Sequence, residues 1–154
     1  MTLPARLSIL LICLITVWET SNAQGRGFGA GVIIGEPTGL SAKAWISDQT
    51  AVVGGAAWNL RGPNDQFQLH LDHLWHFHDA ICSSEQFSPY LGFGGRLIAE
   101  DDGGRFGVRV PLGLVWLPDN APLDVFFEIV PVLDLAPSTN LEGNWGLGAR
   151  FFFQ

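Results

Sequence analysis

The densest group of side chains that could do chemistry is the stretch HLDHLWHFHD, which occupies residues 70–79. Imidazole and carboxylate groups are common ligands of zinc, copper and nickel. On an extended strand His70, Asp72, His76 and His78 would share one face, because successive side chains alternate between faces. His70 and His76 would then lie about 20 Å apart and could not share one ion.

Only His76, His78 and the neighbouring Asp79 therefore remain as candidates for a metal site. The competing interpretation is that these histidines make ordinary hydrogen bonds at the end of a strand. We favour this second interpretation and expect neither a metal nor another cofactor.

Turn signals rich in Gly, Pro, Asn and Asp divide the rest of the chain into eight segments of about ten residues, the length of a tilted transmembrane strand. No segment shows the 3.6-residue period of an amphipathic helix. Evenly spaced strands with short turns indicate an all-β sandwich or barrel. The segments are 27–35, 38–47, 50–60, 66–77, 88–100, 105–117, 123–135 and 141–153.

The alternation of apolar and polar side chains within these segments indicates which face of each strand contacts lipid and which faces the barrel interior. In segment 105–117 one face carries only Phe, Val, Leu and Trp, whereas the other carries Arg105, Gly107, Arg109 and Gly113. A water-soluble barrel would place its large apolar groups inside and varied polar groups outside. The opposite arrangement predicts an eight-stranded antiparallel up-and-down transmembrane β-barrel with its apolar face toward lipid.

The polar face predicts a lumen that is filled by side chains, with no continuous pore. Glycines on this face would make room for long charged side chains, which would pair across the lumen. The members of this predicted charge network are Lys43, Asp72, Arg96, Arg109, Glu128 and Arg150.

Aromatic residues on the apolar face predict girdles at the two membrane interfaces. They are Trp58, Trp75, Trp116, Trp145, Phe151 and Phe153. The alternative is that the tryptophans belong to an ordinary core. Trp45 fits a girdle less well, because it shares its face with Lys43.

Two prolines, Pro111 and Pro131, fall inside predicted strands. Each removes a ladder hydrogen bond, and a closed barrel has no edge at which to place it. We expect bulges or local kinks at these positions.

The N-terminus has the order of features found in a secretory signal peptide. A charged start precedes the apolar run from Leu7 to Trp18, and the small residues Ser21 and Ala23 follow. We predict a signal peptide over residues 1–23 and a barrel domain over 24–154; a buried N-terminal helix is the alternative. Cys13 would leave with the leader, so Cys82 would be a lone loop thiol.

Composition narrows the classes of partner. The formal net charge of −7 argues against nucleic acid as a partner. Charged residues make up 15% of the chain, against about 25% in soluble proteins. Outside the leader, no uninterrupted apolar stretch reaches the 18 residues of a membrane-spanning helix.

The stretches GVIIGEPTGLSAKAW, HLDHLWHF, GFGGRL, GVRVPLGLVWL and VPVLDLAPSTNLEGNWGLGARFFF carry a resemblance over the whole mature chain. The chain resembles the small eight-stranded outer-membrane β-barrels of the OmpA/OmpX type, and more narrowly an uncharacterised family of bacterial outer-membrane barrels. The resemblance includes both prolines, which implies that they belong to the fold. In one departure Gln154 follows the terminal aromatic residue, Phe153.

The resemblance implies a monomer in the bacterial outer membrane, with membrane lipid as its surroundings. It also implies periplasmic chaperones and the barrel-assembly machinery as partners during biogenesis. Both chain ends would be periplasmic, and the turns near residues 36, 63, 102 and 138 would be extracellular.

Two functions stay open at this stage. The first is a non-enzymatic outer-membrane barrel with a structural, envelope or surface-interaction role. The second is a secreted or periplasmic lipocalin-like barrel that binds a small apolar ligand, but such a barrel needs an apolar lumen and a wettable exterior. An enzyme is disfavoured, because no serine is placed beside a histidine on the lipid face.

Overall fold

The computed structural model describes residues 27–59, 66–81, 86–101 and 103–153, and all regular structure in these ranges is β-strand. The strands are β1 (Phe28–Glu36), β2 (Thr38–Trp45), β3 (Thr50–Asn59), β4 (Gln66–His76), β5 (Phe87–Glu100), β6 (Gly103–Arg109), β7 (Leu112–Trp116), β8 (Leu123–Ala136) and β9 (Asn140–Phe153). The predicted signal peptide, Cys82 and Gln154 lie outside the described residues. Within the described ranges, no helix is long and apolar enough to cross a membrane.

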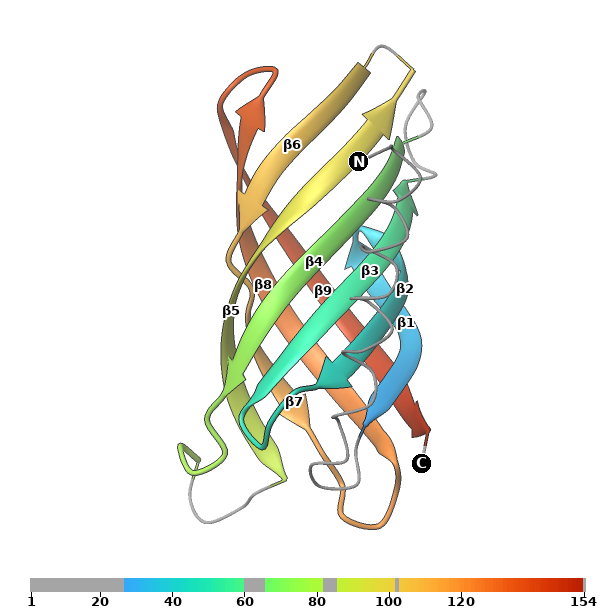
Figure 1. Ribbon diagram of the computed structural model, residues 1–154, viewed down its shortest axis with the longest axis vertical. Coiled ribbons are helices and arrows are strands. Elements are labelled where there is room, and N and C mark those ends of the chain that lie inside the picture. Colours follow the sequence, from blue (N-terminus) through green and yellow to red (C-terminus); the bar gives the residue numbers. More distant parts are fainter. Residues whose placement is uncertain (1–26, 60–65, 82–85, 102, 154) are drawn as a thin grey trace, which may run out of the picture.

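The strands form one closed antiparallel barrel of tilted strands (Figure 1). Each strand pairs with its neighbours along the chain, and β1 closes the ring by pairing with β9 from Phe28↔Phe153 to Glu36↔Trp145. Because β6 and β7 both lie between β5 and β8, they are two halves of one strand, and the ring has eight positions. The predicted eight-stranded barrel is confirmed, and the strand ends lie within two residues of those predicted.

The two prolines explain why one strand is divided in two. Val110 donates its N–H to the carbonyl of Pro131 (3.0 Å), and Gly92 donates to the carbonyl of Pro111 (2.8 Å). Proline has no N–H with which to return either bond, whereas opposed residues in an antiparallel ladder normally exchange both. Two bonds are therefore lost side by side, and the strand is interrupted between Arg109 and Leu112.

The expected bulges at the prolines are not found, however. Arg109↔Val132 and Leu112↔Ile129 keep one register across the interruption, so no extra residue is inserted there. The register of the described strands shifts instead between Phe106 and Gly107, which face Ala136 and Asp134. Of the expected bulges or local kinks, the structure shows an interruption of the strand at Pro111 and no bulge at either proline.

The alternation of side chains divides the barrel into an exposed apolar face and a buried face. Large apolar residues point outward from every strand, among them Ile34, Leu71 and Leu147, and Leu71 at the middle of β4 is 63% exposed. The neighbouring positions point into the lumen and are buried, and they include charged residues as well as Ile33, Leu74 and Phe126. The apolar surface of this fold is therefore on its outside.

Glycines allow the narrow lumen to hold large rings. The guanidinium carbon of Arg150 lies 3.8 Å from the ring centroid of Phe126, and that ring occupies the space where a side chain at Gly148 would be. A Cβ at Gly148 would overlap this ring and lie 2.6 Å from the carbonyl oxygen of Val32. Glycine at this position is thus required by the packing of the lumen.

We expect Gly148→Ala to lower the free energy of unfolding by about 1–3 kcal/mol, because overpacking forces the Phe126 ring and the β1 backbone to move. The measurement is urea unfolding in detergent micelles, followed by tryptophan fluorescence. Gly95→Ala is the matched control, since its added methyl would meet its nearest neighbours at 3.6 and 3.8 Å. Equal effects of the two substitutions would contradict this account of the glycines.

Candidate functional site: the charged lumen

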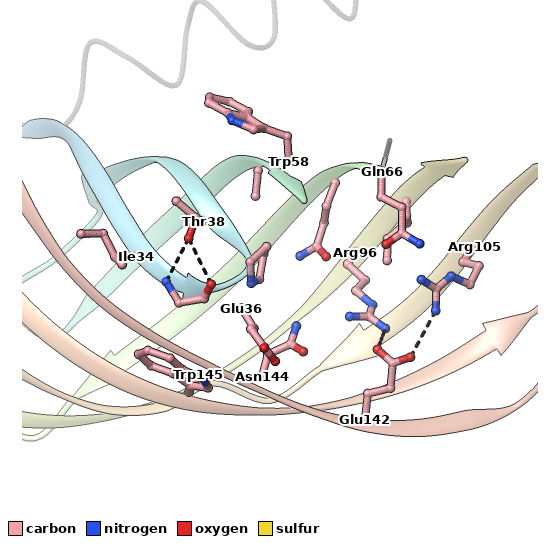
Figure 2. Close-up of a pocket in the computed structure, with 15 residues that line it drawn as sticks. Ile34, Glu36, Thr38, Trp58, Gln66, Arg96, Arg105, Glu142, Asn144 and Trp145 are labelled. Carbon is pink, nitrogen blue, oxygen red and sulfur yellow. Dashed lines mark hydrogen bonds and ion pairs between the residues drawn. The ribbon is translucent and has the colours of Figure 1, made fainter. Parts of the chain in front are cut away.

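The end of the lumen nearest the β5–β6 and β8–β9 hairpins, here called the upper part, holds a hydrogen-bonded cluster of two arginines and three carboxylates. Figure 2 shows Arg96, Arg105 and Glu142 of this cluster. Arg96 on β5 donates from Nε and Nη2 to the two carboxylate oxygens of Asp134 on β8, at 3.0 and 2.7 Å. Its Nη2 also donates to Glu142 on β9 at 2.8 Å. Arg105 on β6 contacts Glu142, Asp134 and Glu100 at 3.2, 3.3 and 2.8 Å. This upper cluster joins β5, β6, β8 and β9.

The middle of the lumen contains a second group of charges, centred on Arg109 of β6. Its Nε lies 3.1 Å from Asp72 on β4, and its Nη2 lies 3.6 Å from Glu128 on β8. The hydroxyl of Tyr90 on β5 donates to Glu128 at 2.7 Å. Arg109 and Asp72 are nearly inaccessible to solvent, so their charges must be balanced within the barrel.

The lower cluster lies near the chain ends and is built around Asp124 of β8. Lys43 on β2 reaches one oxygen of Asp124 across the lumen at 3.4 Å, and Arg150 on β9 lies 3.2 Å from the other. The ammonium of Lys43 also contacts His76 Nε2 at 3.0 Å and lies 4.2 Å from the ring centroid of Trp45. Trp45 is therefore a lumen residue, as its shared face with Lys43 indicated.

All six residues of the predicted charge network thus face the lumen and are buried, and each lies in one of three separate clusters. Sequence reasoning left out Asp124 and Asp134, the anions that bind most of the cations, although both share a face with Glu128. It also left out Arg105 and Glu142. The alternating pattern placed these side chains on the lumen face, but only the stagger of the strands determines which of them meet.

The two histidines considered for a metal site use their ring nitrogens within the protein. His76 contacts Lys43 through Nε2 and the carbonyl of Gln49 through Nδ1, at 3.3 Å. His78 contacts Ser88 through Nδ1 and the carbonyl of Asp48 through Nε2, at 2.5 and 2.7 Å. Among the described residues, no group of three His, Cys, Asp or Glu side chains is placed to hold a metal ion.

The contact between His78 and Ser88 was not foreseen, since Ser88 lies on the next strand, ten residues along the chain. A serine hydroxyl that contacts a histidine is the beginning of a nucleophilic site. Ser88 has an exposed fraction of 0%, so no substrate reaches its oxygen in this structure. The pair instead holds the end of β4 against β5.

The aromatic residues predicted for the girdles all point outward. Trp75, Trp116, Phe151 and Phe153 lie toward the end that holds the described chain termini, where Phe153 also stacks on Phe28 with ring centroids 6.3 Å apart. Trp58 and Trp145 lie toward the opposite end, on either side of the β1–β2 hairpin in the register. The outer surface thus carries aromatic residues at both ends and mainly aliphatic ones between them.

We expect Arg96→Met to lower the free energy of unfolding by about 3–5 kcal/mol, because Asp134 keeps its buried charge and loses its bidentate partner. The double variant Arg96→Met/Asp134→Leu should recover most of this loss, since it removes both charges. Urea unfolding in detergent micelles measures both effects. A single variant that costs less than about 1 kcal/mol, the range of an exposed ion pair, would show that the pair has no structural role.

Comparison with known proteins supports the assignment of the fold. No family model matches the chain, and no curated protein matches it. Among solved structures, the N-terminal β-barrel domain of Pseudomonas aeruginosa OprF superposes with a TM-score of 0.61 at 14% identity, over 82% of this chain and 95% of that one. Neisserial surface protein A gives a TM-score of 0.50 at 19% identity, over 82% and 94%.

Both of these proteins are eight-stranded outer-membrane barrels. At this level of identity the likeness concerns the fold, and it agrees with the closed ring, the apolar exterior and the filled lumen described above. The chain therefore has the fold of the small OmpA-like outer-membrane β-barrels.

Proposed function

We propose that this chain is a bacterial outer-membrane β-barrel protein with a structural, envelope or surface-interaction role, and that it is not an enzyme. The observation that carries the proposal is that the apolar face of the barrel is outside and the charged face is inside, the reverse of a water-soluble barrel. Large apolar side chains cover the outside, whereas the lumen holds paired charges. In a bilayer the apolar exterior meets acyl chains, and the closed ladder satisfies the strand backbone without water.

The lumen supports a structural role rather than transport. Three layers of ion pairs and the rings of Trp45, Tyr90, Phe126 and Phe152 occupy it. The four rings and the charges of the middle and lower layers are almost inaccessible to solvent. An eight-stranded barrel has an interior only wide enough for such side chains. We therefore propose that the barrel is closed to solutes.

The lipocalin-like alternative has less support from the same residues. A ligand of that class needs an apolar cavity inside the barrel, and charged residues occupy the corresponding space here. Its exterior would also have to be wettable, whereas Leu71, Phe93 and Leu97 are all more than half exposed.

The remaining parts of the proposal follow from the outer-membrane fold. The protein would act as a monomer surrounded by outer-membrane lipid, after delivery by periplasmic chaperones and insertion by the barrel-assembly machinery. The described chain ends lie at the lower end of the barrel in Figure 1, which we assign to the periplasm. The opposite end, with the β1–β2, β5–β6 and β8–β9 hairpins, would then face the outside of the cell.

We expect the mature chain from Gln24, refolded from urea into detergent micelles, to migrate differently on a gel before and after boiling. A closed barrel keeps its compact shape in the detergent until heat breaks the ladder. Refolding without micelles is the control and should give no such species. A soluble, folded monomer in plain buffer would contradict the proposal and favour the lipocalin-like barrel.

A further inference from the structure

The rim of the barrel is lower at one place than elsewhere. The β1–β2 hairpin turns at Glu36 and Thr38, level with Trp145 on β9 and Trp58 on β3. Strand β9 continues above this level to Asn140, and β8 continues to Ala136. Figure 1 shows the β1–β2 hairpin ending well below the β5–β6 and β8–β9 hairpins.

A cavity of about 540 Å³ opens at this low part of the rim (Figure 2). Its volume lies within the range of about 300–1,000 Å³ that is usual for ligand sites. Polar side chains of β4, β5 and β9 form the inner wall, and Ile34, Trp58 and Trp145 form the outer lip. The cavity thus joins the polar lumen to the apolar outer surface, and we call it the rim cleft.

The side-chain amide nitrogen Nε2 of Gln68, on the inner wall of the rim cleft, lacks a hydrogen-bond partner among the described residues. The side chain is only 6% exposed. A buried donor that is left unpaired costs about 1–3 kcal/mol. Because Gln68 lines the cleft, a turn of its amide toward the cleft would bring this buried donor to a hydrogen-bond acceptor on a bound molecule, and that bond would remove the cost.

The charges of the cleft argue against an anionic ligand. Arg96 and Arg105 are already balanced by Asp134, Glu142 and Glu100, and the carboxylate of Glu36 lies at the cleft as well. An anion would therefore meet an excess of negative charge. An ammonium group has no acceptor to offer to Gln68.

A ligand with hydroxyl groups suits the uncharged polar side chains of the cleft. The side-chain amides of Gln66, Gln68 and Asn144 line the cleft and offer both donors and acceptors. A hydroxyl group can both donate and accept a hydrogen bond, so it can pair with either. The rings of Trp58 and Trp145 at the lip provide rigid apolar surfaces for the carbon face of such a ligand. A sugar ring combines both kinds of surface.

We propose that the rim cleft binds a neutral polyhydroxylated group, a saccharide unit that enters over the β1–β2 hairpin. The unit is either the headgroup of a glycolipid or part of a free saccharide. The site deepens the proposed surface-interaction role and rests on the barrel being folded.

The test uses the refolded mature chain in amine-oxide micelles, which carry no sugar. Maltose and dodecyl maltoside are titrated separately, and binding is followed through tryptophan fluorescence and the side-chain amide NMR signal of Gln68. We expect a saturable change with at least one of the two. A response to the maltoside alone identifies a glycolipid headgroup, and a response to both identifies a site that also takes a free saccharide.

Two variants and one matched control locate the site. Gln68→Leu and Trp58→Leu should each weaken binding about tenfold or more, whereas Trp116→Leu, an outward tryptophan at the opposite end, should leave it unchanged. Gln68→Leu removes an unpaired donor, so it should not reduce the stability of the barrel. Its boiled and unboiled samples provide the check on folding.

The proposal is overturned if neither probe gives a saturable change, if Gln68→Leu binds as well as the unchanged chain, or if inorganic phosphate competes. Each of these results, obtained on protein that still shows the heat-dependent gel shift, counts against the rim cleft alone. Loss of the gel shift in the unchanged chain would count against the barrel itself.

Discussion

Closure of the hydrogen-bond ladder between β1 and β9 is the constraint on which the rest of the structure depends. A closed ring of eight strands has a lumen only wide enough for side chains. Charges buried in that lumen cannot reach water, so each of them must meet an opposite charge within the barrel. The pairs from Lys43 to Asp124 and from Arg96 to Asp134 satisfy this condition, and glycines such as Gly148 leave the space that the large lumen side chains need.

Closure also explains how one short chain can have an apolar exterior and still a defined fold. Ion pairs and rings in the lumen make the specific contacts that stabilise the fold, and the outer surface is left to contact lipid in the proposed membrane location. The strands differ in length, and this difference creates the rim cleft. The short β1–β2 hairpin leaves polar lumen residues exposed beside Trp58 and Trp145. The same inward and outward alternation thus accounts for the stability and for the proposed binding site.

Turn residues predicted the strand ends, and the period-two pattern predicted the direction of Lys43, Trp45 and the outward tryptophans, because both signals lie within one strand or at its ends. The ring followed from eight such strands with one apolar face. Partners across the lumen could not be predicted, since they depend on strand tilt and stagger. Asp124 and Asp134 were therefore missed as partners, as was the contact of His78 with Ser88. Pro111 marked an interruption correctly, but the shift in register lies at Phe106 and Gly107, where no sequence signal points to it.

The most direct test of an outside that faces lipid compares arginine at two exposed leucines. Leu71 is 63% exposed at the middle of β4, and Leu141 is 73% exposed at the upper rim. For barrels refolded into lipid vesicles, Leu71→Arg should lower the free energy of unfolding by about 2–4 kcal/mol and Leu141→Arg by about 0–1 kcal/mol. If Leu71→Arg is as stable as the unchanged chain, the outward face does not meet lipid and the account is wrong.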